Sequence, residues 1–137
     1  MRIGMLTSGG DCQCLNATME AIAKVLYKKN KDIEIYGILD GFAGLINGKY
    51  KKMEKADFDN ILLSGGTILG TSRQPFKTIT KPDENGRDRV EMMVKNYEKW
   101  KLDALIVLGG NGSHKTANLL HLDLTVLLRL QRKLWII

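Results

Sequence analysis

The stretch RIGMLTSGG, residues 2–10, decides the fold, because a short apolar run ends abruptly in a glycine turn. Such a run is typical of a parallel strand that is buried on both faces. Residues 17–28 follow with apolar side chains at helical spacing, and residues 32–39 alternate as a second strand does. A strand, a helix and a strand of these lengths predict a βαβ unit, whose crossover is right-handed in nearly all proteins.

A second unit of the same design lies further along the chain. Residues 88–100 form a predicted amphipathic helix, and the apolar run at residues 104–108 is a predicted buried strand that ends in GGNG, residues 109–112. The next helix is predicted over residues 113–120. Together the two units predict an α/β fold: a doubly wound, mostly parallel sheet with helices on both faces, present as an incomplete domain.

The middle of the chain is less regular. Residues 41–70 are rich in glycine and hold short pieces, among them a predicted small helix at residues 57–62. Residues 71–86 are polar, contain both prolines, and are predicted to form a long loop. Loops of this length inside compact domains often carry function.

The composition narrows the classes of function. The chain has 137 residues, of which 44% are hydrophobic and 26% charged, as in a single globular domain. No stretch approaches the roughly 18 apolar residues of a membrane helix, and no secretion signal precedes the first strand, so we expect a cytoplasmic protein without a membrane partner. The net charge of +6 is spread along the chain, which indicates solvated lysines or attraction of anionic substrates rather than a nucleic-acid partner.

Cys12 and Cys14 are the two cysteines of the chain. A disulfide across a single residue would be strained, and zinc would need ligands beyond the distant His114 and His121. We therefore expect two free thiols near the start of a helix.

Both glycine turns lead from a predicted strand directly into a helix. Glycines let the backbone approach an anion, and the free N–H groups at the start of a helix point toward it. In an open α/β sheet, ligands bind at the carboxyl ends of the strands, where such turns gather. Taken alone, the turns fit a phosphate site and ligand-free tight turns equally well.

Four motifs follow one another along the chain: LTSGGD at residues 6–11 with LNA at 15–17, DGFAGL at 40–45, GGTILGTSR at 65–73, and GGNGS at 109–113. In this order and at these separations, they resemble the bacterial-type 6-phosphofructokinase family. The resemblance implies that residues 1–121 are the N-terminal, ATP-binding half of a phosphofructokinase-like domain. Residues 122–137 form a tail that does not match.

The resemblance also implies which residues bind the nucleotide. These are Gly10, Arg73, Gln74, Gly110, Asn111, Gly112 and Ser113. Family members that use pyrophosphate typically carry aspartate at the position of Gly112, so the glycine favours ATP as the donor. Asn111 stands where the family has its magnesium-associated aspartate, and its neutral amide implies a weak contribution to Mg²⁺ binding.

Two further parts of the sequence depart from the family pattern. CQC at residues 12–14 replaces the common Ala-Pro-Gly in the first turn. Glu20 stands where allosterically regulated bacterial members have an effector-binding arginine. An acid there would repel an anionic effector, so we expect that regulation to be absent or different.

The activity implied by the resemblance is ATP-dependent phosphoryl transfer to fructose 6-phosphate, which gives fructose 1,6-bisphosphate in glycolysis. The partners would be ATP, Mg²⁺ and a sugar phosphate, and full-length relatives form homo-oligomers. The family's catalytic base lies in a Thr-Ile-Asp-Asn-Asp segment that this chain lacks, so we expect the chain alone to be inactive. A non-catalytic nucleotide-binding fragment and a related NAD or diacylglycerol kinase are the alternatives.

The tail suggests a reading-frame hypothesis. Trp135 has a single codon, TGG, and its last base joined to the first two of Ile136 gives GAT, aspartate. When every codon boundary is moved back by one nucleotide, the codons of residues 130–137 can read Pro-Lys-x-Thr-(Met/Val/Leu)-Asp-Asn. This reading is similar to the missing segment apart from one extra residue. The alternative is a genuine, divergent C-terminal helix over residues 122–137.

Overall fold

The computed structural model describes residues 1–128 and 133–137. Its helices and strands follow one another in this order: β1 (Arg2–Ser8), α1 (Cys14–Lys29), β2 (Glu34–Ile38), α2 (Phe42–Asn47), β3 (Tyr50–Met53), the 3-10 helix η1 (Lys55–Phe58), α3 (Phe76–Ile79), α4 (Arg89–Lys99), β4 (Ala104–Gly109), α5 (Asn111–Leu128) and β5 (Lys133–Ile136). The two predicted strand-turn-helix units are present as β1 with α1 and β4 with α5.

The strands form one sheet in the order β3-β2-β1-β4-β5. The central strand β1 pairs in parallel with β2 on one side and with β4 on the other, and β4 pairs in parallel with β5. Only the β2–β3 pairing of this sheet is antiparallel. The mostly parallel sheet that the sequence predicts is therefore confirmed.

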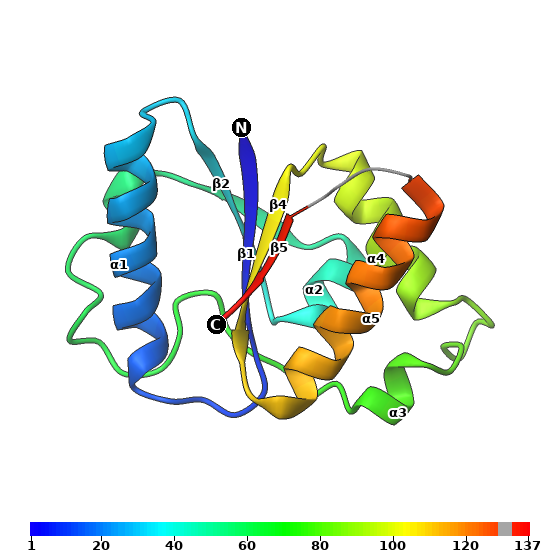
Figure 1. Ribbon diagram of the computed structural model, residues 1–137. Helices are drawn as coiled ribbons and strands as arrows, with labels where there is room; N and C mark the ends of the chain where they lie inside the picture. Colours follow the sequence, from blue (N-terminus) through cyan, green and yellow to red (C-terminus); the bar gives the residue numbers. More distant parts are fainter. Residues whose placement is uncertain (129–132) are drawn as a thin grey trace.

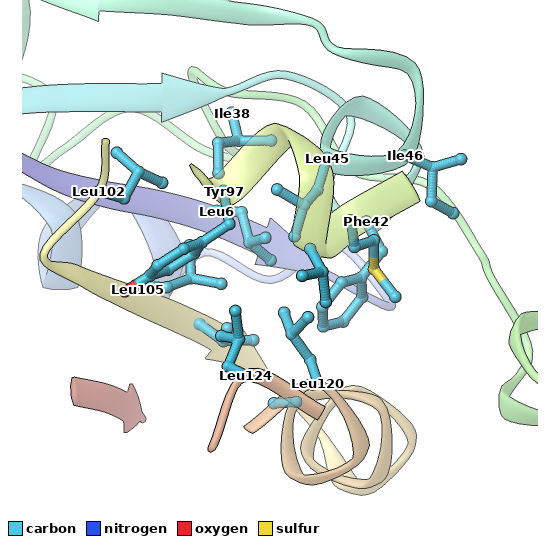
Figure 2. Packing of buried hydrophobic residues seen from close by; sticks show 14 of the residues in the cluster. Leu6, Ile38, Phe42, Leu45, Ile46, Tyr97, Leu102, Leu105, Leu120 and Leu124 are labelled. Atoms are coloured by element: carbon cyan, nitrogen blue, oxygen red, sulfur yellow. The ribbon is translucent and has the colours of Figure 1, made fainter. Parts of the chain in front are cut away.

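Two apolar clusters cover the two faces of the sheet. Leu6 of β1 points into the cluster that α2, α4 and α5 complete, together with Phe42 and Leu120 (Figure 2). The next position back, Met5, points to the opposite face and packs with Met19 of α1. This alternation follows from the two-residue period of a strand. Helices accordingly lie on both faces (Figure 1), and the doubly wound prediction is confirmed.

The start of α4 shows how local sequence sets a helix boundary. The Asp88 carboxylate accepts hydrogen bonds from the backbone N–H groups of Val90 and Glu91, at 2.8 and 3.1 Å, and so caps the helix.

None of the described helices is long and apolar enough to cross a membrane.

The irregular middle of the chain differs from the prediction in three places. The helix predicted at residues 57–62 is wrong in extent, because Glu54 and Asp57 form a reciprocal capping box that starts η1 at Lys55. The long loop at residues 71–86 contains the short helix α3. Residues 50–53, expected among short pieces, pair with β2 as the edge strand β3.

The C-terminal part also extends beyond the prediction. The helix predicted at residues 113–120 begins at Asn111 and continues to Leu128 as α5. β5 then pairs with β4, and the Ile137 N–H donates to the Val107 carbonyl at 2.9 Å. A single helix over the tail is therefore wrong, since part of it is a strand. The frame-shifted origin of the tail stays a prediction.

Candidate phosphate-binding site

The carboxyl ends of β1 and β4 lie side by side. Ser8, the last residue of β1, is paired with Gly109, the last residue of β4. The chain then leaves β1 for α1 on one face of the sheet and leaves β4 for α5 on the other (Figure 1). In an open α/β sheet this is the topological switch point, where ligands bind.

The glycines at these strand ends serve two different purposes. A Cβ atom at Gly109 would lie 2.6 Å from the Ser8 carbonyl oxygen, so only glycine allows the two strand ends to approach this closely. At Gly10, Gly110 and Gly112, by contrast, a Cβ would meet no atom within 4 Å. These three glycines therefore border open space rather than packed neighbours.

Hydroxyl groups tie the loop that precedes α3 to the end of β1. The Thr7 hydroxyl donates to the Gly70 carbonyl at 2.8 Å. Because its single proton is used there, the Thr67 hydroxyl donates to Thr7, also at 2.8 Å. The Thr71 hydroxyl donates to the carbonyl of Gly9, again at 2.8 Å. Gly9 has a φ of +92°, a conformation that suits glycine.

Asn16, in the first turns of α1, holds the same loop from the other side. Its amide nitrogen donates to the carbonyls of Ser64 and Gly65 at 3.0 and 3.3 Å, and its amide oxygen accepts the Ile68 N–H at 2.8 Å. Asn16 is buried, so these bonds are shielded from water. The LNA motif therefore positions the loop that leads to Arg73.

The two turns and the loop border an open cavity of about 350 Å³. Its lining consists of Ser8, Gly9, Gly10, Arg73, Gln74, Pro75, Phe76, Gly110, Gly112 and Ser113. Of the seven residues that the sequence places on the nucleotide, all except Asn111 line this cavity. The structure thus brings together three segments that are far apart in the chain.

The first turn of α5 opens toward this cavity. The His114 N–H donates to the Gly110 carbonyl at 3.0 Å, which is the first bond of the helix. The backbone N–H groups of Asn111, Gly112 and Ser113 have no acceptor within the helix. Together with the helix dipole they favour an anion at this end.

Arg73 supplies the positive side chain of the cavity. It is exposed at the cavity rim, and among the described residues its guanidinium takes part in no ion pair. A guanidinium that is not held by a carboxylate can bind phosphate oxygens with two parallel hydrogen bonds. Gln74, half-buried beside it, adds an amide that can donate to the same ligand.

The structure offers little to hold a metal ion directly. Asn111 is exposed and lies outside the cavity lining. Within the part of the chain that is described, His, Cys, Asp and Glu side chains do not gather in groups of three or more that could bind a metal. The residues present fit a hydrated ion that arrives with the phosphates better than one held by side chains.

Glu20 has a structural partner set of its own. Its buried carboxylate accepts hydrogen bonds from the Lys24 ammonium and from the backbone N–H of Leu62, the latter at 2.7 Å. The Lys24 bond first, and then the bond from Leu62, hold the pKa of Glu20 below its usual range, against the opposing effect of burial. Glu20 therefore fastens α1 to the loop that follows η1.

A second, larger cavity of about 550 Å³ lies between α1 and η1 and shares no residue with the first. Lysines such as Lys24 and Lys55 line it, but its lining contains no glycine and no residue of the four sequence motifs. Residues of the sequence motifs line the smaller cavity, so the smaller cavity is the candidate binding site.

A mostly parallel sheet whose glycine turns border a cavity at the switch point is typical of phosphate-binding proteins of the α/β class. Comparison with protein families narrows this class, because the model of the family described as phosphofructokinase matches residues 2–128. The chain belongs to the phosphofructokinase family. This assignment separates it from the NAD and diacylglycerol kinases that the glycine turn alone left open.

Curated relatives match the same part of the chain. This chain is 51% identical over 120 residues to the ATP-dependent 6-phosphofructokinase of Spirochaeta thermophila, and the match covers 85% of this chain and 32% of the relative. It is 42% identical over 118 residues to that of Bacillus subtilis, covering 85% of this chain and 34% of the relative. The chain thus spans about a third of the length of the curated relatives it matches.

Solved structures show the same fold. Phosphofructokinase from Pichia pastoris in the T-state superposes with a TM-score of 0.76 at 29% identity, covering 98% of this chain and 14% of that one. The pyrophosphate-dependent phosphofructokinase of Marinobacter aquaeolei gives 0.75 at 14% identity, covering 93% and 31%. At that identity the second likeness concerns the fold alone.

Sequence reasoning missed four residues of the cavity. Ser8 and Gly9 belong to the first motif and could have been included, because they end β1. Pro75 and Phe76 directly follow Arg73 and Gln74 but carry no signal of their own. They join the lining because α3 begins at Phe76, and that short helix was not predicted.

Proposed function

We propose that the cavity between the two glycine turns binds the phosphate groups of ATP. The observation that carries this proposal is the meeting of three distant segments, the turn after β1, the loop at Arg73 and the start of α5, around one open cavity of about 350 Å³. Each segment contributes a group that stabilises anions: open glycine backbone, a guanidinium, and unpaired helix N–H groups.

The individual roles follow from position. Gly10, Gly110 and Gly112 leave space for phosphate oxygens, since a side chain there would project into the cavity region. The N–H groups of Gly112 and Ser113 donate to those oxygens, and Arg73 binds them from the opposite rim with Gln74 beside it.

ATP is favoured over pyrophosphate because of Gly112. The residue lies in the cavity lining, and no atom lies within 4 Å of its Cβ position, so the room for a nucleotide α-phosphate is open. An aspartate at this position would fill that room with a like charge. The printed names of the relatives above, ATP-dependent 6-phosphofructokinases, support the same donor.

For the complete protein we propose phosphoryl transfer from ATP to fructose 6-phosphate, giving fructose 1,6-bisphosphate as a step of glycolysis. This chain supplies the donor side of that reaction. Mg²⁺ bound to the nucleotide would neutralise charge on the transferred group, with Asn111 as a weak outer contact at most. The acceptor site and the catalytic base correspond to parts of the relatives that this chain does not match, and assembly into homo-oligomers would belong to the complete protein.

Titration calorimetry on the folded chain tests the proposal. We expect ATP to bind with measurable heat and pyrophosphate to bind at least about tenfold more weakly, a difference of about 1.4 kcal/mol. Equal binding of the two ligands would contradict the choice of donor. Absence of binding by either would contradict the site.

Turnover provides a separate check. Without a catalytic base, the chain mixed with ATP and fructose 6-phosphate should form no fructose 1,6-bisphosphate, even where calorimetry shows ATP binding. Such a result identifies a nucleotide-binding fragment, the second candidate, as the state of the isolated chain. Turnover by the monomeric chain would show that a base had been overlooked.

A further inference from the structure

Two thiols lie in contact next to the turn that follows β1. The sulfur atoms of Cys12 and Cys14 are 2.8 Å apart, close enough for a hydrogen bond between the thiols. Both residues are free cysteines and both are exposed, so a small reagent in solution can reach them. No other cysteine exists in the chain to compete for either thiol.

The start of α1 lies beside this pair of thiols. Cys14 is the first residue of α1, the preceding Gln13 forms no side-chain cap, and the Leu15 N–H donates to the Cys12 carbonyl oxygen at 3.3 Å. The N–H groups of Cys14 and Asn16 have no acceptor within the helix. The hydrogen bond from the Cys14 thiol, followed by bonds from the N–H groups of Cys14 and Leu15, lowers the pKa of Cys12, although burial and the nearby Asp11 oppose this.

The two thiols are therefore not equivalent. The pKa of Cys12 is lowered, which favours its thiolate. The pKa of Cys14 is raised, mainly because its thiol donates a hydrogen bond to Cys12. The thiolate is the form of cysteine that attacks an electrophile, and the start of a helix is a known setting for reactive cysteines. Of the two, Cys12 is the expected nucleophile.

We propose that Cys12 and Cys14 form a redox-active dithiol that hydroperoxides oxidise to an intramolecular disulfide, with Cys12 as the attacking thiol and Cys14 as the resolving thiol. The proposal concerns a function that is separate from nucleotide binding. It rests on the contact between the two sulfur atoms, their exposure and their place at the start of α1.

The reaction has two steps. The Cys12 thiolate attacks one oxygen of hydrogen peroxide, a sulfur–oxygen bond forms, the oxygen–oxygen bond breaks, and the leaving hydroxide takes up a proton as water. The sulfur of Cys14 then attacks the sulfenic acid on Cys12, the disulfide forms, and the departing hydroxide takes the proton of the Cys14 thiol and leaves as a second water. The two thiols lose two electrons, which reduce the peroxide to water.

The disulfide should be easy to reverse. A ring closed across one intervening residue is strained, and strained, exposed disulfides are the ones that thiol reductants open readily. The reduced form with two free thiols and the oxidised form are therefore both accessible, as a switch requires.

Mass spectrometry of the intact chain provides the test. After treatment with hydrogen peroxide, we expect the monomer to lose two hydrogen atoms and both titratable thiols, and dithiothreitol to restore them. Retention of both thiols, or disulfide-linked dimers in place of the oxidised monomer, would overturn the proposal. Neither readout needs a nucleotide, so this test can fail while nucleotide binding stands, and the reverse.

One variant and one labelling experiment test the division of roles. In Cys14→Ser, Cys12 should stop at the sulfenic acid, which the sulfenic-acid reagent dimedone traps as an adduct. In the wild-type chain, where both thiols keep their partner, a limiting amount of iodoacetamide should alkylate Cys12 before Cys14, because the rate follows the fraction of thiolate. Equal alkylation of the two cysteines, read from the mass of the peptides, would overturn the assignment of Cys12 as nucleophile.

Discussion

The hydroxyl of Thr71 donates to the carbonyl oxygen of Gly9 at 2.8 Å, and this bond joins two motifs that lie 62 residues apart in the chain. Thr71 stands two positions before Arg73, whereas Gly9 belongs to the glycine turn after β1. The bond therefore sets the distance between the guanidinium and the backbone that together border the cavity. Positioning of this kind affects ligand binding without contact to the ligand.

Replacing Thr71 by valine should weaken ATP binding. Thr71→Val keeps the shape of the side chain but removes the hydroxyl, so the Gly9 carbonyl loses its partner at a cost of about 0.5–1.5 kcal/mol. Calorimetry should show this loss in the ATP affinity, with Thr71→Ser, which retains a hydroxyl, close to wild type. A valine variant that binds ATP as tightly as the serine variant would show that the bond does not position the site.

Replacing Arg73 by alanine should weaken ATP binding more strongly. A hydrogen bond to a charged phosphate contributes about 1.5–3 kcal/mol, so Arg73→Ala should bind ATP about tenfold to a hundredfold less tightly. Because Arg73 is exposed and holds no carboxylate among the described residues, the fold should be unaffected. Arg73→Lys keeps the charge but not the paired donors, so its ATP affinity should lie between that of wild type and that of Arg73→Ala. Unchanged affinity in Arg73→Ala would place the guanidinium outside the site.

The Glu20 carboxylate should make stability depend on pH. Its pKa is lower in the folded chain than in the unfolded chain, so its contribution is complete above the ordinary glutamate pKa and is lost as the pH falls through the folded value. Glu20→Gln should thus lower the urea midpoint at neutral pH, and the difference from wild type should shrink on acidification. Glu98→Gln, at an exposed position of α4, is the matched control. A constant difference at all pH values would contradict the ionic role.

The fold could be predicted where local signals were strong. β1 and β4 are apolar runs closed by glycine pairs, and both were found with small errors at their ends. β3 could not be found, because its four residues are mostly exposed and polar and become a strand only by pairing with the edge of β2. Edge strands of this kind depend on tertiary context more than on their own sequence.

The site was predictable to the extent that motifs mark it. Gly110, Gly112 and Ser113 line the cavity as expected, but Asn111 within the same motif does not. Successive residues of a helix are rotated by about 100°, so a run of residues at the start of α5 cannot all face one cavity. That the helix begins at Asn111 rather than later is a tertiary fact that the glycine pattern did not reveal.

The reading frame of the C-terminal tail can be tested on the gene itself. We expect the neighbouring frame beyond codon 120 to encode Pro-Lys-x-Thr-x-Asp-Asn and then a phosphofructokinase-like continuation. Trp135 with Ile136 forces the aspartate of that segment. Part of the reread segment, residues 129–132, lies outside the residues that the structure describes. A neighbouring frame without any such continuation would show that the tail is genuine.

The most direct test of the phosphate site is calorimetric titration of ATP into Gly112→Asp. A Cβ at this position meets no atom within 4 Å, and an acid in the first turn of a helix is favourable, so the variant should fold as stably as wild type. Its carboxylate would compete for the same N–H groups that the phosphate needs. We predict that Gly112→Asp loses at least about tenfold in ATP affinity, or about 1.4 kcal/mol, while the neutral Gly112→Asn loses less. Equal ATP affinity in wild type and Gly112→Asp, with both chains folded, would contradict the assignment of this cavity to the nucleotide.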